Sequence, residues 1–466
     1  MIHLNLEKIK SREELYQYLK DALRLPENCG QNLDAVYDVL TESAEEREIL
    51  IEGLEAYNEV SGGYGKRLLR MLTYAAKTTE GLQVKVVEQG VEKKHAAGTL
   101  AADQALAFHR PHVFYLTGIN ERMPEQGIFY GDDGEPVVRL QFKNASSVEM
   151  EIGGEKMPFT EIEEGLWELF PKVAPGFYYV FLRVDGAEVL SSFLPIGYGY
   201  SHPTNFLEIG PAEPFYANQD VPNGSLHHEY FRSSVTGEKE TCLVYTPYGY
   251  EESEEEYPVL YLQHGFGENE TGWVWQGRML QIADNLLAEK KAVPMIIVMA
   301  DGMVKKYNGG ECELIFQQFP EYLIRDIIPF IEKKYRVKKD RFHRAMAGLS
   351  MGSIQTSMTV FENPELFGWA GLFSGFMRNF LGTDRLEDDH LQKLYTDTET
   401  FNQELYLFYR AMGEQDVFWR FFEKDDKICE KYQIRQTRRV FQGGHDWNVW
   451  RKCLYEFMQM IFIKEE

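Results

Sequence analysis

A serine in a glycine-flanked five-residue pattern is the first feature of this sequence that suggests chemistry. The segment Gly348-Leu-Ser-Met-Gly352 fits G-x-S-x-G, follows a short apolar run from Arg344, and precedes a helix-compatible segment from Ser353 to Phe361. A strand, a sharp turn and a helix form the context in which such a serine stands on a strained turn with its hydroxyl lifted clear of the sheet. The small neighbours let strand and helix approach each other. Ser350 is therefore the candidate nucleophile.

A serine nucleophile needs a base within hydrogen-bond reach and a third group that orients the base. His445 lies in the glycine-rich turn Gln442-Gly-Gly-His-Asp446, between a predicted strand and the last predicted helix. Asp416 ends the segment Met412-Gly-Glu-Gln-Asp416, which directly follows another predicted strand. We predict that Asp416 holds the Nδ1 proton of His445 and that His445 Nε2 takes the proton of the Ser350 hydroxyl. This chemistry implies no metal and no cofactor.

Four other polar residues compete for roles in this arrangement. Glu414 and Asp446 are alternative acids, but a residue adjacent to the histidine cannot easily reach its Nδ1, so we interpret Asp446 as the N-cap of the last helix. His264 and His343 both precede the serine, whereas the acid and the histidine follow the nucleophile in the order expected for this type of turn. We therefore interpret both of these histidines as structural residues.

Nucleophilic attack on a carbonyl also requires donors for the oxygen that becomes negatively charged. The backbone N–H of Met351 is placed by the serine turn itself. A second donor is expected from the loop Gln263-His-Gly-Phe-Gly267, where Gly265 lets the chain turn and the Phe266 N–H can point inward. Losing one such donor typically costs about 3 kcal/mol in the transition state.

The region from 212 to 466 contains all of these residues and must position them. Its apolar, strand-like runs begin at Thr241, Tyr257, Pro294, Ala345, Trp369 and Leu405. Amphipathic segments such as Phe319 to Tyr335 separate these runs. Near-continuous apolar strands alternating with helices predict a mostly parallel sheet with helices on both faces, so the fold class is α/β.

Two further regions precede this one. Residues 111–211 contain alternating runs, such as Val137-Val-Arg-Leu-Gln-Phe142 and Gly176-Phe-Tyr-Tyr-Val-Phe181, separated by turn signals, which predict a β-sandwich of about a hundred residues. Residues 93–110 are small and polar and are interpreted as a linker. Residues 1–92 are predicted to form a small α/β domain in the order β-α-α-α-β, with its second helix from Leu33 to Thr41.

Composition excludes several classes of function. The net charge is −24 over 466 residues, which argues against binding to nucleic acids or anionic membranes. The five cysteines are scattered without a C-x-x-C spacing, a usage that suits a reducing compartment. The N-terminus does not resemble a signal peptide, and no window approaches 18 apolar residues. The expectation is a cytoplasmic protein without a membrane span.

The segments Tyr261-Leu-Gln-His-Gly-Phe-Gly267, Gly348-Leu-Ser-Met-Gly352 and Gly443-Gly-His-Asp-Trp-Asn-Val-Trp450 resemble the putative-esterase family, especially carbohydrate esterase family 1, with its feruloyl and acetyl-xylan esterases. The resemblance covers about residues 110–466. It implies an α/β-hydrolase fold with Ser350, Asp416 and His445 as the catalytic triad. It also implies Phe266 and Met351 as oxyanion donors, and Trp273, Trp275 and Trp447 as candidate residues of the substrate pocket. Enterochelin esterases share these motifs and remain an alternative for the substrate.

The segment Leu25-Pro-Glu-Asn-Cys-Gly-Gln-Asn-Leu-Asp-Ala-Val-Tyr-Asp-Val-Leu40 resembles barstar, an intracellular ribonuclease inhibitor. The resemblance implies that Asp34 and Asp38, at i and i+4 of one helix, contact a nuclease-like protein partner. Asn28-Cys29 replaces the aromatic pair of barstar, and the third helix offers Lys66 and Arg67 where the family has an acidic contact. These departures favour a docking or stabilising module over an inhibitor.

Residues 111–211 resemble the early-set, immunoglobulin-like domains that precede carbohydrate-active catalytic domains, which implies a spacer or a lining of the active site. The combined prediction is a serine carboxylesterase acting on small esters, of the hydroxycinnamoyl or acetyl type on carbohydrates. Two alternatives stand beside it: a siderophore esterase of the enterochelin type, and a protein-binding module whose partner defines the role.

Overall fold

The computed structural model of the protein describes residues 2–26, 29–42, 47–54, 57, 60–61, 64–79, 81–87, 99–100, 126–131, 134–308, 310–377, 391 and 397–463. The chain divides into two compact units, Met1–Gly98 and Thr99–Glu466. None of the described helices combines the length and the apolar composition that crossing a membrane requires. The predicted linker, 93–110, lies outside the described residues apart from Thr99–Leu100.

The first unit is a three-stranded parallel sheet with helices packed on it. Its elements are β1 (Ile2–Asn5), α1 (Arg12–Leu23), α2 (Leu33–Glu42), β2 (Arg47–Glu52), α4 (Tyr64–Thr78) and β3 (Leu82–Val87). The strands lie in the order β1-β2-β3, and both pairings are parallel. Leu19 of α1, Val36 of α2 and Leu72 of α4 are fully buried and meet Ile49 and Ile51 of β2 in one core.

The predicted β-α-α-α-β order of this unit is wrong in one respect, because β2 lies between α2 and α4. The run Arg47-Glu-Ile-Leu-Ile-Glu52 has a three-residue apolar centre with charges on both sides. Periodicity cannot separate so short a run from a helical turn. It is nevertheless the central strand, since its backbone pairs with both neighbours.

The strand-rich part of the second unit consists of two sheets around one core. Its strands are β4 (Thr99–Leu100), β5 (Gly127–Tyr130), β6 (Pro136–Gln141), β7 (Val148–Ile152), β8 (Glu155–Pro158), β9 (Thr160–Glu163), β10 (Leu166–Leu169), β11 (Gly176–Val184), β12 (Ala187–Val189), β13 (Ile196–Gly199) and β14 (His202–Ile209). One sheet has the order β4-β5-β6-β10-β9. The other has the order β13-β14-β11-β7-β8, with β12 paired to β11. Alternate residues of both sheets, such as Val138 and Leu182, fill the shared core. The immunoglobulin-like class of this part stays a prediction.

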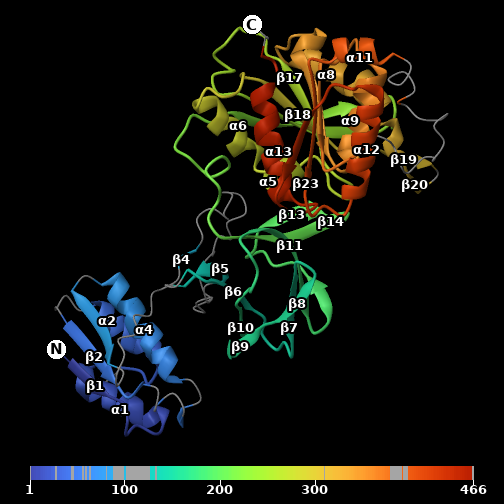
Figure 1. Ribbon diagram of the computed structural model, residues 1–466. Coiled ribbons are helices and arrows are strands. Elements are labelled where there is room, and N and C mark those ends of the chain that lie inside the picture. Colours follow the sequence, from blue (N-terminus) through green and yellow to red (C-terminus); the bar gives the residue numbers. More distant parts are fainter. Residues whose placement is uncertain are drawn as a thin grey trace. The chain divides into compact units, whose positions relative to one another are not determined.

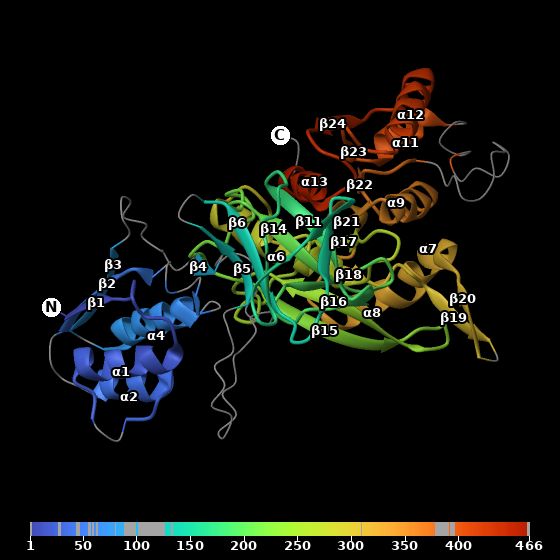
Figure 2. The same ribbon diagram turned by 90° about the horizontal axis from the view of Figure 1, so that it is seen from below.

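The remainder of the second unit alternates strands and helices. Its elements are β15 (Ser225–Arg232), β16 (Lys239–Thr246), β17 (Val259–Gln263), α5 (Gly272–Trp275), α6 (Met279–Ala288), β18 (Ile296–Ala300), β19 (Lys305–Asn308), β20 (Glu311–Leu314), η2 (Phe316–Gln318), α7 (Phe319–Tyr322), η3 (Leu323–Ile327), α8 (Ile328–Lys334), η4 (Arg341–His343), β21 (Arg344–Leu349), α9 (Met351–Glu362), β22 (Trp369–Phe373), α11 (Thr398–Glu404), β23 (Leu407–Gly413), α12 (Trp419–Tyr432), β24 (Thr437–Phe441) and α13 (Trp447–Met460). The main sheet has the order β15-β16-β18-β17-β21-β22-β23-β24, which can be followed in Figure 2.

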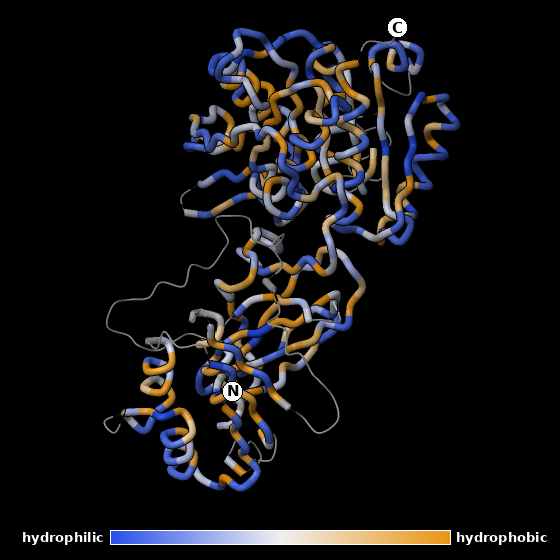
Figure 3. The backbone as a smooth tube through the Cα atoms, turned by 90° about the vertical axis from the view of Figure 1, so that its left-hand side faces the viewer, coloured by the Kyte–Doolittle hydropathy of each residue, from blue (hydrophilic) through white to orange (hydrophobic). Residues whose placement is uncertain are grey.

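This sheet is parallel from β18 to β24, and helices cover both of its faces. Successive strand residues point to opposite faces, so Tyr261 and Met346 enter one core whereas Leu262 and Ala347 enter the other. Figure 1 shows α6 and α13 on one side of the strands and α9 and α12 on the other. The hydrophobic stretches run through the interior of this part (Figure 3). The predicted mostly parallel, doubly covered sheet is confirmed.

A buried ion-pair cluster joins the strand-rich part to the α/β part. The Glu208 carboxylate in β14 contacts the guanidinium of Arg278, just before α6, and its Oε1 lies 2.5 Å from Nη1 of Arg451 in α13. Burial alone would raise the pKa of Glu208, but the charges of Arg451 and Arg278 outweigh it and lower that pKa. The two parts therefore share polar interior as well as apolar contacts.

Candidate active site

Ser350 stands on the sharp turn between β21 and α9. Its φ of 51° and ψ of −115° are a strained combination for a residue with a Cβ. A Cβ on Gly348 would lie 2.5 Å from the carbonyl oxygen of Gly352, and a Cβ on Gly352 would lie 2.7 Å from the carbonyl oxygen of His264. Both glycines of the pattern are thus required by close backbone approaches, and the turn forms as the pattern predicts.

The structure brings Ser350, His445 and Asp416 together at the carboxyl edge of the sheet. Nε2 of His445 lies 3.0 Å from Oγ of Ser350, and Nδ1 of His445 lies 2.9 Å from Oδ2 of Asp416. The three residues follow β21, β23 and β24, whose parallel pairing places their carboxyl ends side by side. A carboxylate at Nδ1 favours the imidazole tautomer that presents a lone pair at Nε2 to the serine hydroxyl.

Packing and hydrogen bonds fix the histidine and its carboxylate. The Asp416 side chain is fully buried, and its Oδ1 accepts a hydrogen bond of 2.9 Å from the Phe418 N–H. The rings of Phe418 and Trp450 meet the His445 ring edge to face, with centroids 4.9 and 5.1 Å away. The imidazole is therefore held on both sides, while a fifth of its surface remains open to a substrate.

The rival acids take other positions. Asp446 accepts hydrogen bonds from the N–H groups of Asn448 and Val449 over 2.9 and 3.2 Å, so its interpretation as the N-cap of α13 is confirmed. Glu414 is exposed at the end of β23. Asp416 is the carboxylate that contacts Nδ1 of His445.

The two expected oxyanion donors belong to backbone beside the serine. Met351 is the first residue of α9, so its N–H has no acceptor within the helix. Phe266 lies in the loop after β17, and a Cβ on the preceding Gly265 would lie 3.5 Å from Cβ of Ser350. The Phe266 ring itself is 60% exposed. That these two N–H groups bind an oxyanion remains a prediction.

His264 is buried and bound at both ring nitrogens. Its Nδ1 lies 2.8 Å from the Gly265 carbonyl oxygen, and its Nε2 accepts a hydrogen bond of 2.8 Å from the Gly302 N–H. These contacts support the structural interpretation of this histidine. His343 lies in η4, directly before β21, and its Nδ1 lies 2.7 Å from Oδ2 of Asp340.

Two of the three predicted pocket tryptophans are core residues. Trp273 is 1% and Trp447 is 0% exposed, and their rings meet edge to face at 5.1 Å. Their indole N–H groups donate to the carbonyl of Gln263 and to the carboxylate of Glu268, over 2.8 and 3.1 Å. The prediction that they line a pocket needs this correction, because buried rings offer a ligand no surface. Trp275 is partly buried in α5.

Glu268 and Tyr179 were not among the predicted site residues. Glu268 follows the Gly265-Phe-Gly267 turn directly, and its Oε2 accepts a hydrogen bond of 3.0 Å from the Gly265 N–H. Its Oε1 accepts another of 2.8 Å from the Tyr179 hydroxyl in β11. Burial raises the pKa of both side chains. A carboxyl group directly after a glycine turn was the available signal for Glu268, whereas Tyr179 resembles any other strand aromatic in the sequence.

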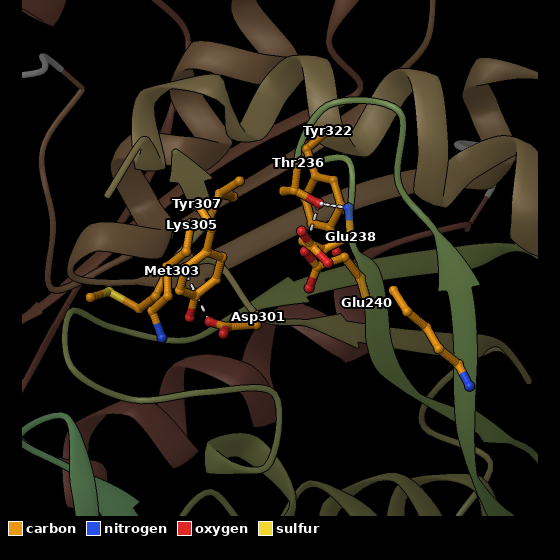
Figure 4. Close-up of a pocket in the computed structure, with 10 residues that line it drawn as sticks. Thr236, Glu238, Glu240, Asp301, Met303, Lys305, Tyr307 and Tyr322 are labelled. Carbon is orange, nitrogen blue, oxygen red and sulfur yellow. Dashed lines mark hydrogen bonds between the residues drawn. The ribbon is translucent and has the colours of Figure 1, made fainter. Parts of the chain in front are cut away.

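A polar pocket of about 460 Å³ lies at the end of β18. Figure 4 shows its lining side chains, which are Thr236, Glu238, Lys239, Glu240, Asp301, Met303, Val304, Lys305, Tyr307 and Tyr322. Met303 packs with Phe316 and Met351, so it stands between this pocket and the serine turn. Neither Ser350 nor His445 lines the pocket.

The expected partner residues of the first unit lie on α2. Asp38 is exposed, whereas the side chain of Asp34 lies outside the described residues, as does that of Lys66. Arg67 is exposed in α4, and Asn28 lies outside the described residues. The spacing of four positions on one helix puts Asp34 and Asp38 on the same helical face.

Comparison with known proteins gives two family matches. Residues 233–460 match the family described as putative esterase, and residues 1–89 match the family described as barstar (barnase inhibitor). An endo-1,4-beta-xylanase/feruloyl esterase of Xylanibacter ruminicola is 30% identical over 377 residues, which are 77% of this chain and 49% of the relative. Endo-1,4-beta-xylanase Y of Acetivibrio thermocellus is 32% identical over 157 residues, 31% of this chain and 14% of the relative. The chain thus spans about half the length of the first relative and less of the second.

The solved structure of the enterobactin esterase FES of Shigella flexneri is similar to 73% of this chain and 94% of its own, with a TM-score of 0.50 and 13% identity. At that identity the likeness concerns the fold alone. Together with the doubly covered parallel sheet, it confirms an α/β-hydrolase-like fold for the part that carries Ser350.

Proposed function

We propose that the chain is a serine esterase with an attached protein-docking module, because residues 233–460 match the putative esterase family and residues 1–89 match the barstar family. The observation that carries the esterase is the chain of hydrogen bonds from Ser350 through His445 to Asp416, at 3.0 and 2.9 Å. A buried carboxylate, an oriented imidazole and a strained serine form the arrangement that nucleophilic acyl transfer requires.

The proposed reaction has two halves. In the first, Ser350 Oγ attacks the ester carbonyl carbon while its proton passes to Nε2 of His445. The tetrahedral intermediate places its negative oxygen at the N–H groups of Phe266 and Met351. His445 then returns the proton to the departing alcohol, which leaves an acyl group on Ser350.

In the second half a water molecule attacks the acyl carbonyl, and His445 takes the proton of the water. The intermediate collapses, the proton returns to Ser350 Oγ, and the carboxylic acid leaves. The Asp416 carboxylate orients the imidazole and stabilises the imidazolium that forms in each half.

We propose hydroxycinnamoyl or acetyl esters of carbohydrates as the substrates. The support is the similarity to the Xylanibacter ruminicola protein, whose name includes feruloyl esterase. A siderophore ester is the second candidate, and the fold shared with an enterobactin esterase over 73% of the chain is compatible with it.

The test is hydrolysis of p-nitrophenyl acetate, methyl ferulate and a catecholate siderophore ester by the wild type and by Ser350→Ala. Removing the nucleophile should lower kcat by roughly 10⁴-fold or more, without a change in the thermal unfolding midpoint. The ratio of kcat/KM between the three esters identifies the acyl group. A wild type inactive on all three, or an equally active Ser350→Ala, would overturn the proposal.

For residues 1–92 we propose a docking module for a nuclease-like or other basic protein. The match to the barstar family and the exposed Asp38 on α2 support this role. Asp34→Ala/Asp38→Ala should weaken binding to a basic ribonuclease at low salt, measured by calorimetry, and equal binding by wild type and double variant would contradict it.

A further inference from the structure

Contacts on both sides hold the loop that carries the Phe266 N–H. On the N-terminal side, the Gly265 N–H donates to Oε2 of Glu268 over 3.0 Å. On the C-terminal side, the Gly267 carbonyl oxygen accepts a hydrogen bond of 2.7 Å from the Ser201 N–H, in the turn between β13 and β14. The expected oxyanion donor therefore sits between two anchored glycines.

Three hydrogen-bond donors contact the Glu268 carboxylate. Oε1 accepts from the Tyr179 hydroxyl over 2.8 Å and from the Trp447 indole N–H over 3.1 Å, while Oε2 accepts from Gly265. The residue is 6% exposed. An ionised carboxylate, which only accepts, satisfies three donors at once, whereas an amide of the same shape brings a donor of its own.

Tyr179 links this carboxylate to the strand-rich part. Its hydroxyl donates to Glu268 and accepts from Nε2 of Gln276 over 2.9 Å. Gln276 also donates to the carbonyl of Tyr198 in β13 over 2.9 Å. Both acceptors of the Gln276 side-chain nitrogen thus come from strands of the strand-rich part, which orients the Tyr179 hydroxyl toward Glu268.

Resting on the proposed esterase function, we infer that the strand-rich part completes the oxyanion hole, with Tyr179 and Glu268 as positioning residues for the Phe266 N–H. Neither side chain touches the substrate in this scheme. They act through the Gly265 N–H, which fixes the loop before charge develops on the ester oxygen. Preorganised donors stabilise the transition state more than the bound substrate, so the effect belongs to kcat rather than KM.

The first test compares Tyr179→Phe with Tyr178→Phe. Both variants lose one hydroxyl from the same strand, but the Tyr178 hydroxyl donates to the Ala174 carbonyl, away from Glu268. Tyr179→Phe should lower kcat by roughly 10- to 100-fold with KM within about twofold, the scale of a small misplacement in an active site. Tyr178→Phe should match the wild type. Equal kcat values for the two variants would overturn the inference.

The second test is inhibition by phenylboronic acid, whose tetrahedral adduct with a serine presents an oxygen at the oxyanion position. In Tyr179→Phe and Glu268→Gln, the inhibition constant should rise by the same factor as kcat falls. A merely structural role would lower the unfolding midpoint and leave the inhibition constant of the folded protein unchanged. If Glu268→Gln does not fold, the comparison of Tyr179→Phe with Tyr178→Phe tests the inference without it.

These outcomes are separable from failure of the esterase proposal. If the wild type is inactive and binds no boronic acid, the esterase proposal itself is refuted. If the wild type is active, Ser350→Ala is inactive and Tyr179→Phe has the kcat of the wild type, only the positioning role is refuted.

Discussion

The backbone N–H of Phe177 donates a hydrogen bond of 2.8 Å to Oδ1 of Asn448, although the two residues are 271 positions apart in the sequence. Phe177 belongs to β11 of the strand-rich part, and Asn448 lies in the first turn of α13, three residues after His445. A Cβ on Gly176 would lie 3.1 Å from the Asn448 side chain. The start of the helix behind the histidine is therefore fixed by a strand from another part of the unit.

Asn448→Ala should lower stability, because it leaves the Phe177 N–H without its acceptor. The expected loss is about 1–2 kcal/mol in the free energy of unfolding. Denaturant unfolding measures it, and Gln459→Ala on the same helix is the control, since the Gln459 amide donates to the Tyr455 carbonyl one turn away. Equal stabilities of the two variants would show that the contact between strand and helix contributes nothing.

Adding one methyl group at two glycines should have unequal effects. At Gly352 the new Cβ would meet the backbone oxygens of His264 and Gln263 at 2.7 and 2.8 Å, and neither can move without disturbing β17. At Gly265 it would meet Cδ1 of Leu349 at 2.7 Å, which is the end of a side chain rather than backbone. We expect Gly352→Ala to lose about 1–3 kcal/mol of stability and most activity, and Gly265→Ala to lose clearly less of both. Thermal melts and ester hydrolysis check the order, and a reversed order would refute the steric argument.

Asp326 should contribute stability that depends on pH. Burial alone would raise its pKa, but hydrogen bonds from Ser233, Ser234 and the Val235 N–H outweigh burial and lower the pKa. A carboxyl group with a lowered folded-state pKa stabilises the protein above its unfolded pKa, near 4, and loses this contribution as the pH falls through the folded value.

Asp326→Asn should therefore cost about 1–2 kcal/mol at pH 7 and progressively less toward pH 3. Urea unfolding across this range measures the difference from the wild type. The exposed Asp220 gives the control variant Asp220→Asn, whose stability at pH 7 should lie within about 0.5 kcal/mol of the wild type. A penalty for Asp326→Asn that is constant from pH 7 to pH 3 would contradict the assignment.

Removing the charge of Glu208 should strongly lower the stability of the folded protein. Glu208→Gln removes the carboxylate charge that contacts the buried guanidinium groups of Arg278 and Arg451, for which we expect a loss of about 3–5 kcal/mol. Glu321→Gln breaks the exposed pair with Arg325 and should cost less than about 1 kcal/mol. Denaturant unfolding of both variants measures the contrast, and similar losses would mean that the buried cluster is compensated elsewhere.

The proximity of Ser350, Asp416 and His445 could be predicted because each residue follows a strand of one parallel sheet. Parallel strands end at a common edge, so the order of motifs along the chain already implies a meeting point. The same logic identified the loop of Phe266. Local pattern was sufficient wherever the contact followed from the direction of a strand.

Other features depend on contacts that no local pattern records. β2 was missed because its apolar run is three residues long, and its place is set by pairing on both sides. Trp273 and Trp447 were assigned to a pocket because aromatic type alone does not separate a core ring from an exposed one. Tyr179 and Glu268 are 89 positions apart in the sequence. They meet because β11 of the strand-rich part packs against the loop that follows β17.

The Glu208 cluster also bears on how such a chain can be rearranged by recombination. A module joined through a flexible tether can be exchanged for any other of similar length. Here a carboxylate supplied by β14 contacts cations that lie before α6 and within α13, so a foreign segment in place of residues 126–209 would remove the Glu208 carboxylate from two buried guanidinium groups. We therefore expect the strand-rich part and the α/β part to be inherited together as one unit.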